Sequence, residues 1–237
     1  MEKQRRHKKI RLDTTTLDGK MLLTDNAEIL NLSSGGASLQ SDKGLIVGNR
    51  YLITCAGKGK GIRVTGIAVH SEFAGPGEKS GTESAARYTA HIRFDAGQDE
   101  RVAYLIDSVE RDREMDSSVE TERRRHVRFR MTIPLESILS HTGRFNVKTM
   151  SMTGMLIQSL QPLEINNTVP MELSLTTGSR VSFIGRVASC IMTNDNGREC
   201  YDIGVEFQDL TETGRSMLRA FLSSLAAAKD TTAGETA

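Results

Sequence analysis

Residues 123–130 have the sequence RRRHVRFR, which places five arginines and one histidine in eight positions. Three kinds of segment show such a density of positive charge: a solvated linker, a nucleic-acid-binding patch, or a clamp on a small, doubly charged ligand. The stretch before it, RDREMDSSVETE at 111–122, is polar and without an apolar period, as in a linker. The arginines therefore stand at the start of a second domain.

A search for internal similarity finds a counterpart of this segment near the N-terminus. Setting Arg11 against Arg128 aligns Ile10 with Val127 and Leu12 with Phe129. The offset then grows by about one residue per loop, as insertions in loops allow. Three segment pairs follow it: HKKIRL (7–12) with RHVRF (125–129), NLSSGG (31–36) with TMSMTG (149–154), and VTGIAVHS (64–71) with FIGRVASC (183–190). The chain is an internal duplication, with a first and a second copy.

Each copy consists of short β-rich runs separated by turn residues, such as the hairpin signal NDNG at 194–197. The first copy has a longer Gly/Ser-rich loop at 74–86. Each copy ends in a segment with apolar residues at helical spacing. These are Val102, Leu105, Ile106 and Val109 in the first copy, and Met217, Leu218, Phe221, Leu222 and Leu225 in the second. The predicted fold is mainly β: two small antiparallel β-barrels, each closed by a C-terminal α-helix.

The predicted domains follow the duplication. We expect an N-terminal domain at 1–112, a linker at 113–122, a C-terminal domain at 123–230 and a flexible tail at 231–237. Hydrophobic residues make up 38% of the 237 and charged residues 26%, which supports two small globular cores.

Charge and composition argue against several classes of protein. The net charge of +1 gives no long-range field for DNA, and aromatic residues at 5% with no tryptophan leave few platforms for stacking bases. We expect neither DNA nor RNA as a partner. The start of the chain lacks a signal-peptide pattern and no apolar run could span a bilayer, so a cytoplasmic location without a transmembrane segment is expected.

No pattern of an enzyme or a metal site is visible. The three cysteines, Cys55, Cys190 and Cys200, have no CxxC spacing and are interpreted as buried thiols, the latter two on neighbouring strands. The five histidines have no metal-ligand spacing. Without a catalytic triad or paired carboxylates, we expect a protein that is not an enzyme and has no cofactor.

The order of motifs in each copy resembles the PilZ domain, the bacterial receptor domain for cyclic di-GMP. An arginine pair of form RxxxR comes first, a [D/N]xSxxG turn follows about 20 residues later, and a helix closes the domain. The resemblance occurs once in each copy and together covers nearly the whole chain. It implies a tandem, flagellar-brake-like PilZ protein with cyclic di-GMP as its ligand. It also implies an unidentified protein partner in motility, secretion or exopolysaccharide machinery.

The resemblance implies a ligand site in each copy. The predicted residues are Arg123, Arg124, Arg128, Thr149, Ser151 and Gly154 in the second copy, and Arg6, His7, Arg11, Asn31, Ser33 and Gly36 in the first. The second copy should be the main site because its arginine pair is complete, although Thr149 stands where the family has Asp or Asn. The first copy has a full NxSxxG, but histidine replaces its first arginine.

The chemistry of these residues suits a cyclic dinucleotide. Arginine binds phosphate and the O6/N7 edge of guanine as a fork and stacks flat on a base. Small polar side chains meet base or backbone donors, and glycine leaves room where a side chain would block the ligand. Two functions remain open: a cyclic di-GMP-binding regulator that changes its interdomain arrangement, and a degenerate, ligand-independent PilZ interaction scaffold.

Overall fold

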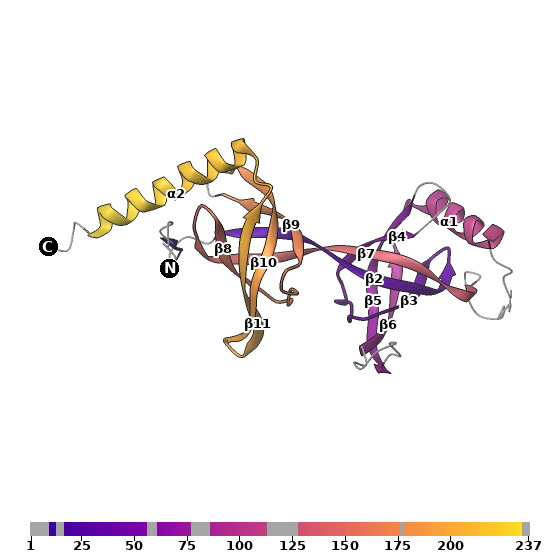
Figure 1. Cartoon of the computed structure of the whole chain (residues 1–237). Helices are drawn as coiled ribbons and strands as arrows, with labels where there is room; N and C mark the ends of the chain where they lie inside the picture. The colour runs from indigo at the N-terminus through magenta and orange to yellow at the C-terminus, as the bar shows by residue number, and fades with distance from the viewer. Residues whose placement is uncertain are drawn as a thin grey trace. The chain divides into compact units, whose positions relative to one another are not determined.

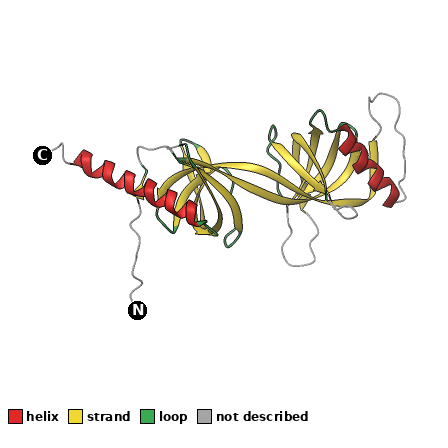
Figure 2. Cartoon of the chain, turned by 90° about the horizontal axis from the view of Figure 1, so that it is seen from above, coloured by secondary structure: helices red, strands yellow, loops and turns green. Residues whose placement is uncertain are grey.

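The computed structural model describes residues 10–12, 17–55, 61–76, 86–112, 128–175 and 178–233. It is mainly antiparallel β with two helices, which confirms the predicted fold class (Figures 1 and 2). The elements are β1 Ile10–Arg11, β2 Asp18–Ser33, β3 Gly36–Ser41, β4 Arg50–Cys55, β5 Ile62–Pro76, β6 Ala86–Phe94, α1 Asp99–Asp112, β7 Arg128–Met150, β8 Gly154–Ser159, β9 Thr168–Ser174, β10 Arg180–Asp195, β11 Arg198–Gln208 and α2 Glu212–Ala233.

The chain forms two compact units. We call the described residues within 24–141 the N-barrel, and those within 1–23 and 142–237 the C-barrel. The N-barrel has the strand order β7-β4-β5-β6-β3-β2 and contains α1. The C-barrel has the order β2-β9-β10-β11-β8, to which β7 adds by pairing with β8, and contains α2. In addition β7 pairs with β2, so that the strand order closes on itself.

Two long strands, β2 and β7, belong to both barrels. In the C-barrel, Gly19 of β2 is opposite Leu173 of β9, whereas in the N-barrel Ala27 of β2 is opposite Ser41 of β3. Strand β7 does the reverse, because Ser137 is opposite Cys55 of β4 and Phe145 is opposite Ser159 of β8. Each barrel thus combines the strands of one copy with the first part of the other copy's long strand. The predicted boundaries, 1–112 and 123–230, divide the chain by sequence repeat and do not include this exchange.

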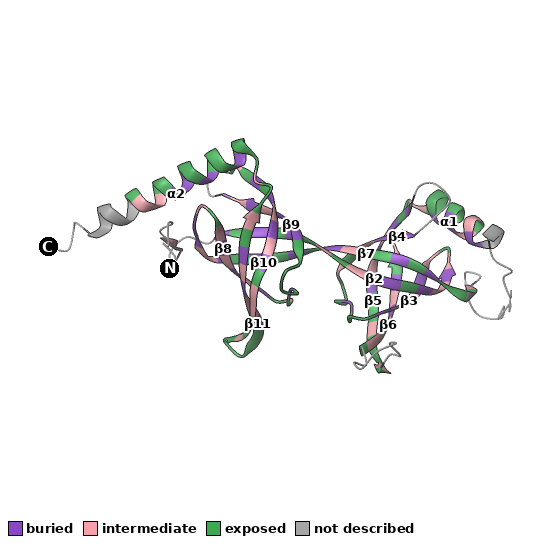
Figure 3. Cartoon of the chain, viewed as in Figure 1, coloured by how far each residue is buried: buried purple, intermediate pink, exposed green. Residues whose placement is uncertain are grey.

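The hydrophobic cores contain the same exchange. In the N-barrel, Met131 and Leu135 of the second copy pack with Ile29 and Leu32 of the first. In the C-barrel, Leu17 and Met21 of the first copy pack with residues of the second. Buried and exposed residues alternate along most strands (Figure 3), as a sheet with one face on a core requires. The exchanged segments are therefore integral parts of the cores they enter.

Backbone irregularities recur at equivalent positions of the two copies, which supports the duplication. A bulge lies between Ile29 and Asn31 in β2, and another between Val147 and Thr149 in β7. A second pair of bulges interrupts β5 at 68–70 and β10 at 187–189. Bulges re-aim the side chains that follow them. Here, the first pair comes immediately before the two xSxxG motifs.

The predicted hairpin and helices are confirmed. Asn196 and Gly197 have φ values of 52° and 83°, the left-handed conformation that a two-residue β10–β11 turn requires. Helix α1 begins with Asp99 and Glu100 in its first turn, where acidic groups favour the helix dipole. The predicted apolar stripes face the cores, except that Met217 is exposed.

The cysteines differ in one respect from the prediction. Cys55 and Cys200 are buried, but Cys190 is partly exposed. All three are unpaired. Cys190 and Cys200 do lie on the neighbouring strands β10 and β11, where their opposite residues are Ile203 and Thr193. The two thiols are therefore separated along the strands.

Candidate ligand-binding site

The two predicted xSxxG motifs form turns with the same hydrogen bond. Ser33 Oγ donates to the carbonyl oxygen of Gly36 at 3.1 Å in the β2–β3 connection. Ser151 Oγ donates to the carbonyl oxygen of Gly154, also at 3.1 Å, in the β7–β8 connection. Ser151 is 5% exposed. Both hydroxyl protons are therefore used to fix the turn, and Ser151 Oγ in addition accepts a hydrogen bond from Thr153 N at 3.3 Å.

The glycine of each motif lies where another strand comes very close. A Cβ on Gly36 would lie closer than 3.0 Å to the carbonyl oxygen of Ile92 in β6, a separation that real Cβ atoms do not show. At Gly154 the obstructing atom is the carbonyl oxygen of Val205 in β11. The sequence interpretation gave these glycines the role of making room for a ligand. The structure supplies a different physical reason, which is close packing of neighbouring backbones.

The first residue of each motif follows a bulge and is partly exposed. Asn31 lies opposite Ser38 of β3, and Thr149 lies opposite Leu156 of β8. Beside Asn31, Ser38 Oγ is 2.7 Å from Nδ1 of His91. These side chains can offer hydrogen-bond donors and acceptors to a ligand that lies over the turn.

The polar groups around the two turns differ. Next to Thr149, Lys148 Nζ forms an ion pair with Asp202 at 2.6 Å. On the other side of His91, the ring centroid of His70 lies 5.5 Å away. The surroundings of the N-barrel turn thus include two imidazole groups, and those of the C-barrel turn include an ion pair.

The predicted arginines are distributed across the barrels. Arg11 of β1 lies opposite Thr149 of β7, and Leu12 N donates to the carbonyl oxygen of Lys148 at 3.1 Å. The backbone of Arg11, a residue of the first copy, is therefore paired with the strand end that leads into the turn of the second copy. Arg128 is the first residue of β7, whose next residues enter the core of the N-barrel. Arg6, His7, Arg123 and Arg124 lie outside the described residues.

The strand exchange changes which motif halves share a barrel. Strand β7, which begins at Arg128, the second arginine of RxxxR, enters the N-barrel, which holds the NxSxxG turn of Asn31. In the C-barrel, Arg11, the arginine of HxxxR, lies in β1 opposite Thr149 of the TxSxxG turn. The sequence motifs by themselves group these residues by copy. The signal for the other grouping is complementarity, because each copy has the half of the motif that is incomplete in the other copy.

The described residues contain no cluster of three or more His, Cys, Asp or Glu side chains that could hold a metal ion. Over the same residues, no helix is long and apolar enough to cross a membrane. The thiol of Cys55, which could act as a nucleophile only as thiolate, is fully buried. Burial raises the pKa of this thiol to about 12. Cys55 is therefore unsuited to nucleophilic chemistry at neutral pH.

This pKa predicts the reactivity of the thiols. At pH 8 only about one in ten thousand Cys55 side chains is thiolate, and this fraction rises only as the pH approaches the raised pKa. We expect iodoacetamide to leave Cys55 unmodified in the native protein at pH 8, while the partly exposed Cys190 reacts. Mass spectrometry of digested protein measures both, and urea-unfolded protein is the control in which all three react. Equal native rates at Cys55 and Cys190 would contradict the prediction.

Comparison with known proteins gives a domain match and distant structural likenesses. Residues 122–224 match the family described as "PilZ domain". The C-terminal half of the chain thus contains a PilZ domain, as its motifs predicted. Curated proteins yield no match.

Three solved structures are similar over most of their length. MrkH of K. pneumonia is 13% identical, with 87% of this chain and 88% of that chain covered and a TM-score of 0.34. The apo state of MrkH is 12% identical, with 88% and 90% covered and a TM-score of 0.36. YcgR from Escherichia coli in complex with c-di-GMP is 12% identical, with 89% and 88% covered and a TM-score of 0.35.

Proposed function

We propose that this protein is a cyclic di-GMP-binding regulator, and that its main ligand site lies in the N-barrel. The observation that carries the proposal is the course of β7, which begins at Arg128, the second arginine of RxxxR, and enters the barrel that holds Asn31 and Ser33. The proposed site combines the arginine pair of the second copy with the NxSxxG turn of the first. The PilZ domain matched at 122–224 and the c-di-GMP complex of YcgR support the choice of ligand.

The proposed contacts follow from the chemistry of the ligand. Arg128 offers a guanidinium fork to a guanine O6/N7 edge or a phosphate, and it can also stack on a base. The amide of Asn31 both donates and accepts hydrogen bonds, so it can pair with a guanine edge. Arg124 belongs to the same proposed set. The first copy has histidine at position 7, which cannot offer a guanidinium fork, and Thr149 lacks the amide, so we expect the C-barrel to bind weakly or not at all.

The proposed signal passes through β7 itself. This strand begins at Arg128 and ends at Met150, one residue before Ser151 of the other barrel's turn. A ligand that holds its first residues restrains a strand that both barrels share, and thereby changes the interdomain arrangement and the surface offered to a partner. We place this partner in motility, secretion or exopolysaccharide machinery, and the protein in the cytoplasm.

One observation favours a second candidate, a scaffold that binds no ligand. The hydroxyls of Ser33 and Ser151 and the glycines of both motifs have structural roles in their turns and strands, so the turns do not require a ligand to explain them. In this case the duplicated barrels act only as an interaction module.

A calorimetric titration of the whole chain separates the two functions. We expect cyclic di-GMP to bind at a single class of site, with GMP and single-stranded RNA binding at least about a hundredfold more weakly, since neither presents two guanines and two phosphates in one compact ring. A salt series checks that the contacts involve charge. A second site of similar affinity would contradict the assignment to one barrel. Absence of heat and of a thermal shift at millimolar ligand would favour the scaffold.

A further inference from the structure

The residue opposite the motif glycine has opposite charge in the two barrels. In the N-barrel, Gly36 of β3 is opposite Arg93 of β6. In the C-barrel, Gly154 of β8 is opposite Glu206 of β11. Both pairs are close, because a Cβ on Gly36 would lie 3.3 Å from Cα of Arg93, and a Cβ on Gly154 would lie 3.2 Å from Cα of Glu206. The two barrels therefore present a cation and an anion at the same place beside the xSxxG turn.

In the N-barrel this charge shares the outer face with the first residue of the motif. Arg93 and Glu206 are both exposed. Asn31 is opposite Ser38, which in turn is opposite His91, two residues before Arg93 on β6. Opposite residues share a face, and so do residues two apart on a strand. Asn31 and Arg93 therefore lie on one face, two strands and about 10 Å apart across the sheet.

The residue on the next strand also differs between the barrels. Glu206 is opposite Arg186 of β10 and forms an ion pair with it. In the N-barrel, the residue opposite Arg93 on β5 is Ile67, which has no charge to offer. The cross-strand ion pair of the C-barrel is therefore not repeated beside the turn of Asn31.

The acidic residue nearest to Arg93 in the sequence, Asp95, interacts with other residues. Asp95 Oδ2 accepts a hydrogen bond from Thr65 Oγ1 at 2.8 Å and lies 3.0 Å from Nε of Arg50. Across the strands, Arg93 has a glycine on one side and an isoleucine on the other. Its exposed guanidinium can therefore meet an anionic ligand that lies over the turn.

We propose that Arg93 is a further ligand-binding residue of the N-barrel site, an assignment that rests on the proposed function, and that Glu206 helps to exclude the ligand from the C-barrel. Cyclic di-GMP has two phosphates and two guanines, and a guanidinium binds a phosphate or a guanine O6/N7 edge as a fork. Asn31 and Arg93 hold different parts of the ligand on one outer face. At the C-barrel turn the Glu206 carboxylate repels a phosphate, because like charges brought together are unfavourable.

Substitution of Arg93 tests the contact in the whole chain. Calorimetry should show that Arg93→Ala weakens cyclic di-GMP binding roughly tenfold, and that Arg93→Lys weakens it less, because lysine keeps the charge but not the fork. The affinity of Arg93→Ala should also depend less on salt than that of the wild type. Since Arg93 is exposed, the thermal unfolding midpoint should stay within a few degrees.

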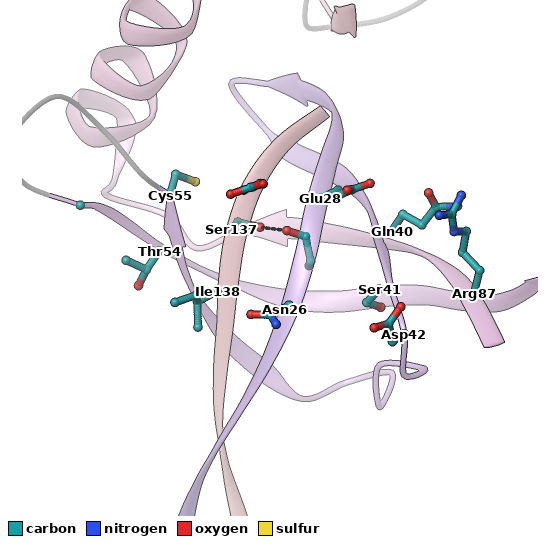
Figure 4. A pocket seen from close by; sticks show the side chains of 13 residues that line it. Asn26, Glu28, Gln40, Ser41, Asp42, Thr54, Cys55, Arg87, Ser137 and Ile138 are labelled. Carbon is teal, nitrogen blue, oxygen red and sulfur yellow. Dashed lines mark hydrogen bonds between the residues drawn. The ribbon is translucent and has the colours of Figure 1, made fainter. Parts of the chain in front are cut away.

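Two control variants remove a charge elsewhere. Arg87, six residues before Arg93 on β6 and about 20 Å away along the strand, lines a surface pocket with Gln40 and Asp42 (Figure 4). Arg87→Ala should change the affinity less than about twofold. Glu206→Ala alters the equivalent position of the C-barrel and should also change it less than about twofold.

The outcomes separate this assignment from the proposed function. Wild-type affinity in Arg93→Ala would overturn the role of Arg93 and leave the cyclic di-GMP proposal standing. Equal weakening in Arg87→Ala would show a general effect of charge and would overturn the role as well. A change in Glu206→Ala without one in Arg93→Ala would place the ligand in the C-barrel. Absence of binding to the wild type would contradict both proposals.

Discussion

Replacement of Arg128 by alanine should weaken cyclic di-GMP binding by roughly ten- to a hundredfold, the loss expected when a hydrogen-bonded guanidinium is removed from a charged ligand. Arg128 is the first residue of β7, three residues before Met131, a residue of the N-barrel core. The substitution should therefore leave the thermal unfolding midpoint within a few degrees of the wild type. Calorimetry of the whole chain measures the affinity. The matched control is Arg11→Ala, the equivalent residue of the first copy, which should change it less than about twofold.

A double-mutant cycle tests which turn Arg128 works with. In the proposed N-barrel site, Arg128 and Asn31 contact one ligand, so Arg128→Ala and Asn31→Ala should be non-additive, with an interaction energy of about 0.5–3 kcal/mol. Arg128→Ala and Thr149→Ala should add, because Thr149 belongs to the C-barrel. The opposite result, coupling to Thr149 and additivity with Asn31, would return the site to the second copy alone.

Replacement of Gly154 by alanine should destabilise the protein by about 3 kcal/mol, at the upper end of the range for overpacking. The added Cβ would lie against a backbone carbonyl oxygen, that of Val205, which cannot rotate away as a side chain could. Gly36→Ala should cost a similar amount in the N-barrel, where the obstacle is the carbonyl oxygen of Ile92. Urea unfolding followed by circular dichroism measures both.

The control for the glycine variants is Ser182→Ala, at an exposed position of β10, which should change the free energy of unfolding by less than about 0.5 kcal/mol. A change of less than 1 kcal/mol in Gly154→Ala would mean that β8 and β11 can separate at little cost. In that case, the glycine would instead reflect a requirement of the ligand, as the sequence interpretation had it.

Much of the fold could be predicted from the sequence because the duplication repeats the same signals twice. The turn at NDNG, the two closing helices and the strand character of most segments follow from residue type and period. The strand exchange could not be predicted this way. The two copies have the same alternation of apolar and polar residues, so the hydrophobic pattern allows the start of β2 to pair within its own copy or with the other.

Parts of the candidate site were hidden for the same reason. From the sequence alone, the missing motif halves look like loss of function in each copy. Their complementarity is visible only once β7 is known to enter the N-barrel.

The sharing of β2 and β7 also bears on biosynthesis. As the chain leaves the ribosome, the strands β3 to β6 of the first copy emerge without Met131, Leu135 and Leu139, three residues of the core they are to form. Until β7 arrives, β4 has an unpaired edge on the side that later binds residues 137–140. Contacts between distant parts of a chain form slowly, because loop closure must precede them. In the arrangement of the whole chain, the N-barrel is therefore complete only after β7 has been made, and the nascent first copy must remain unaggregated until more than half of the protein has been translated.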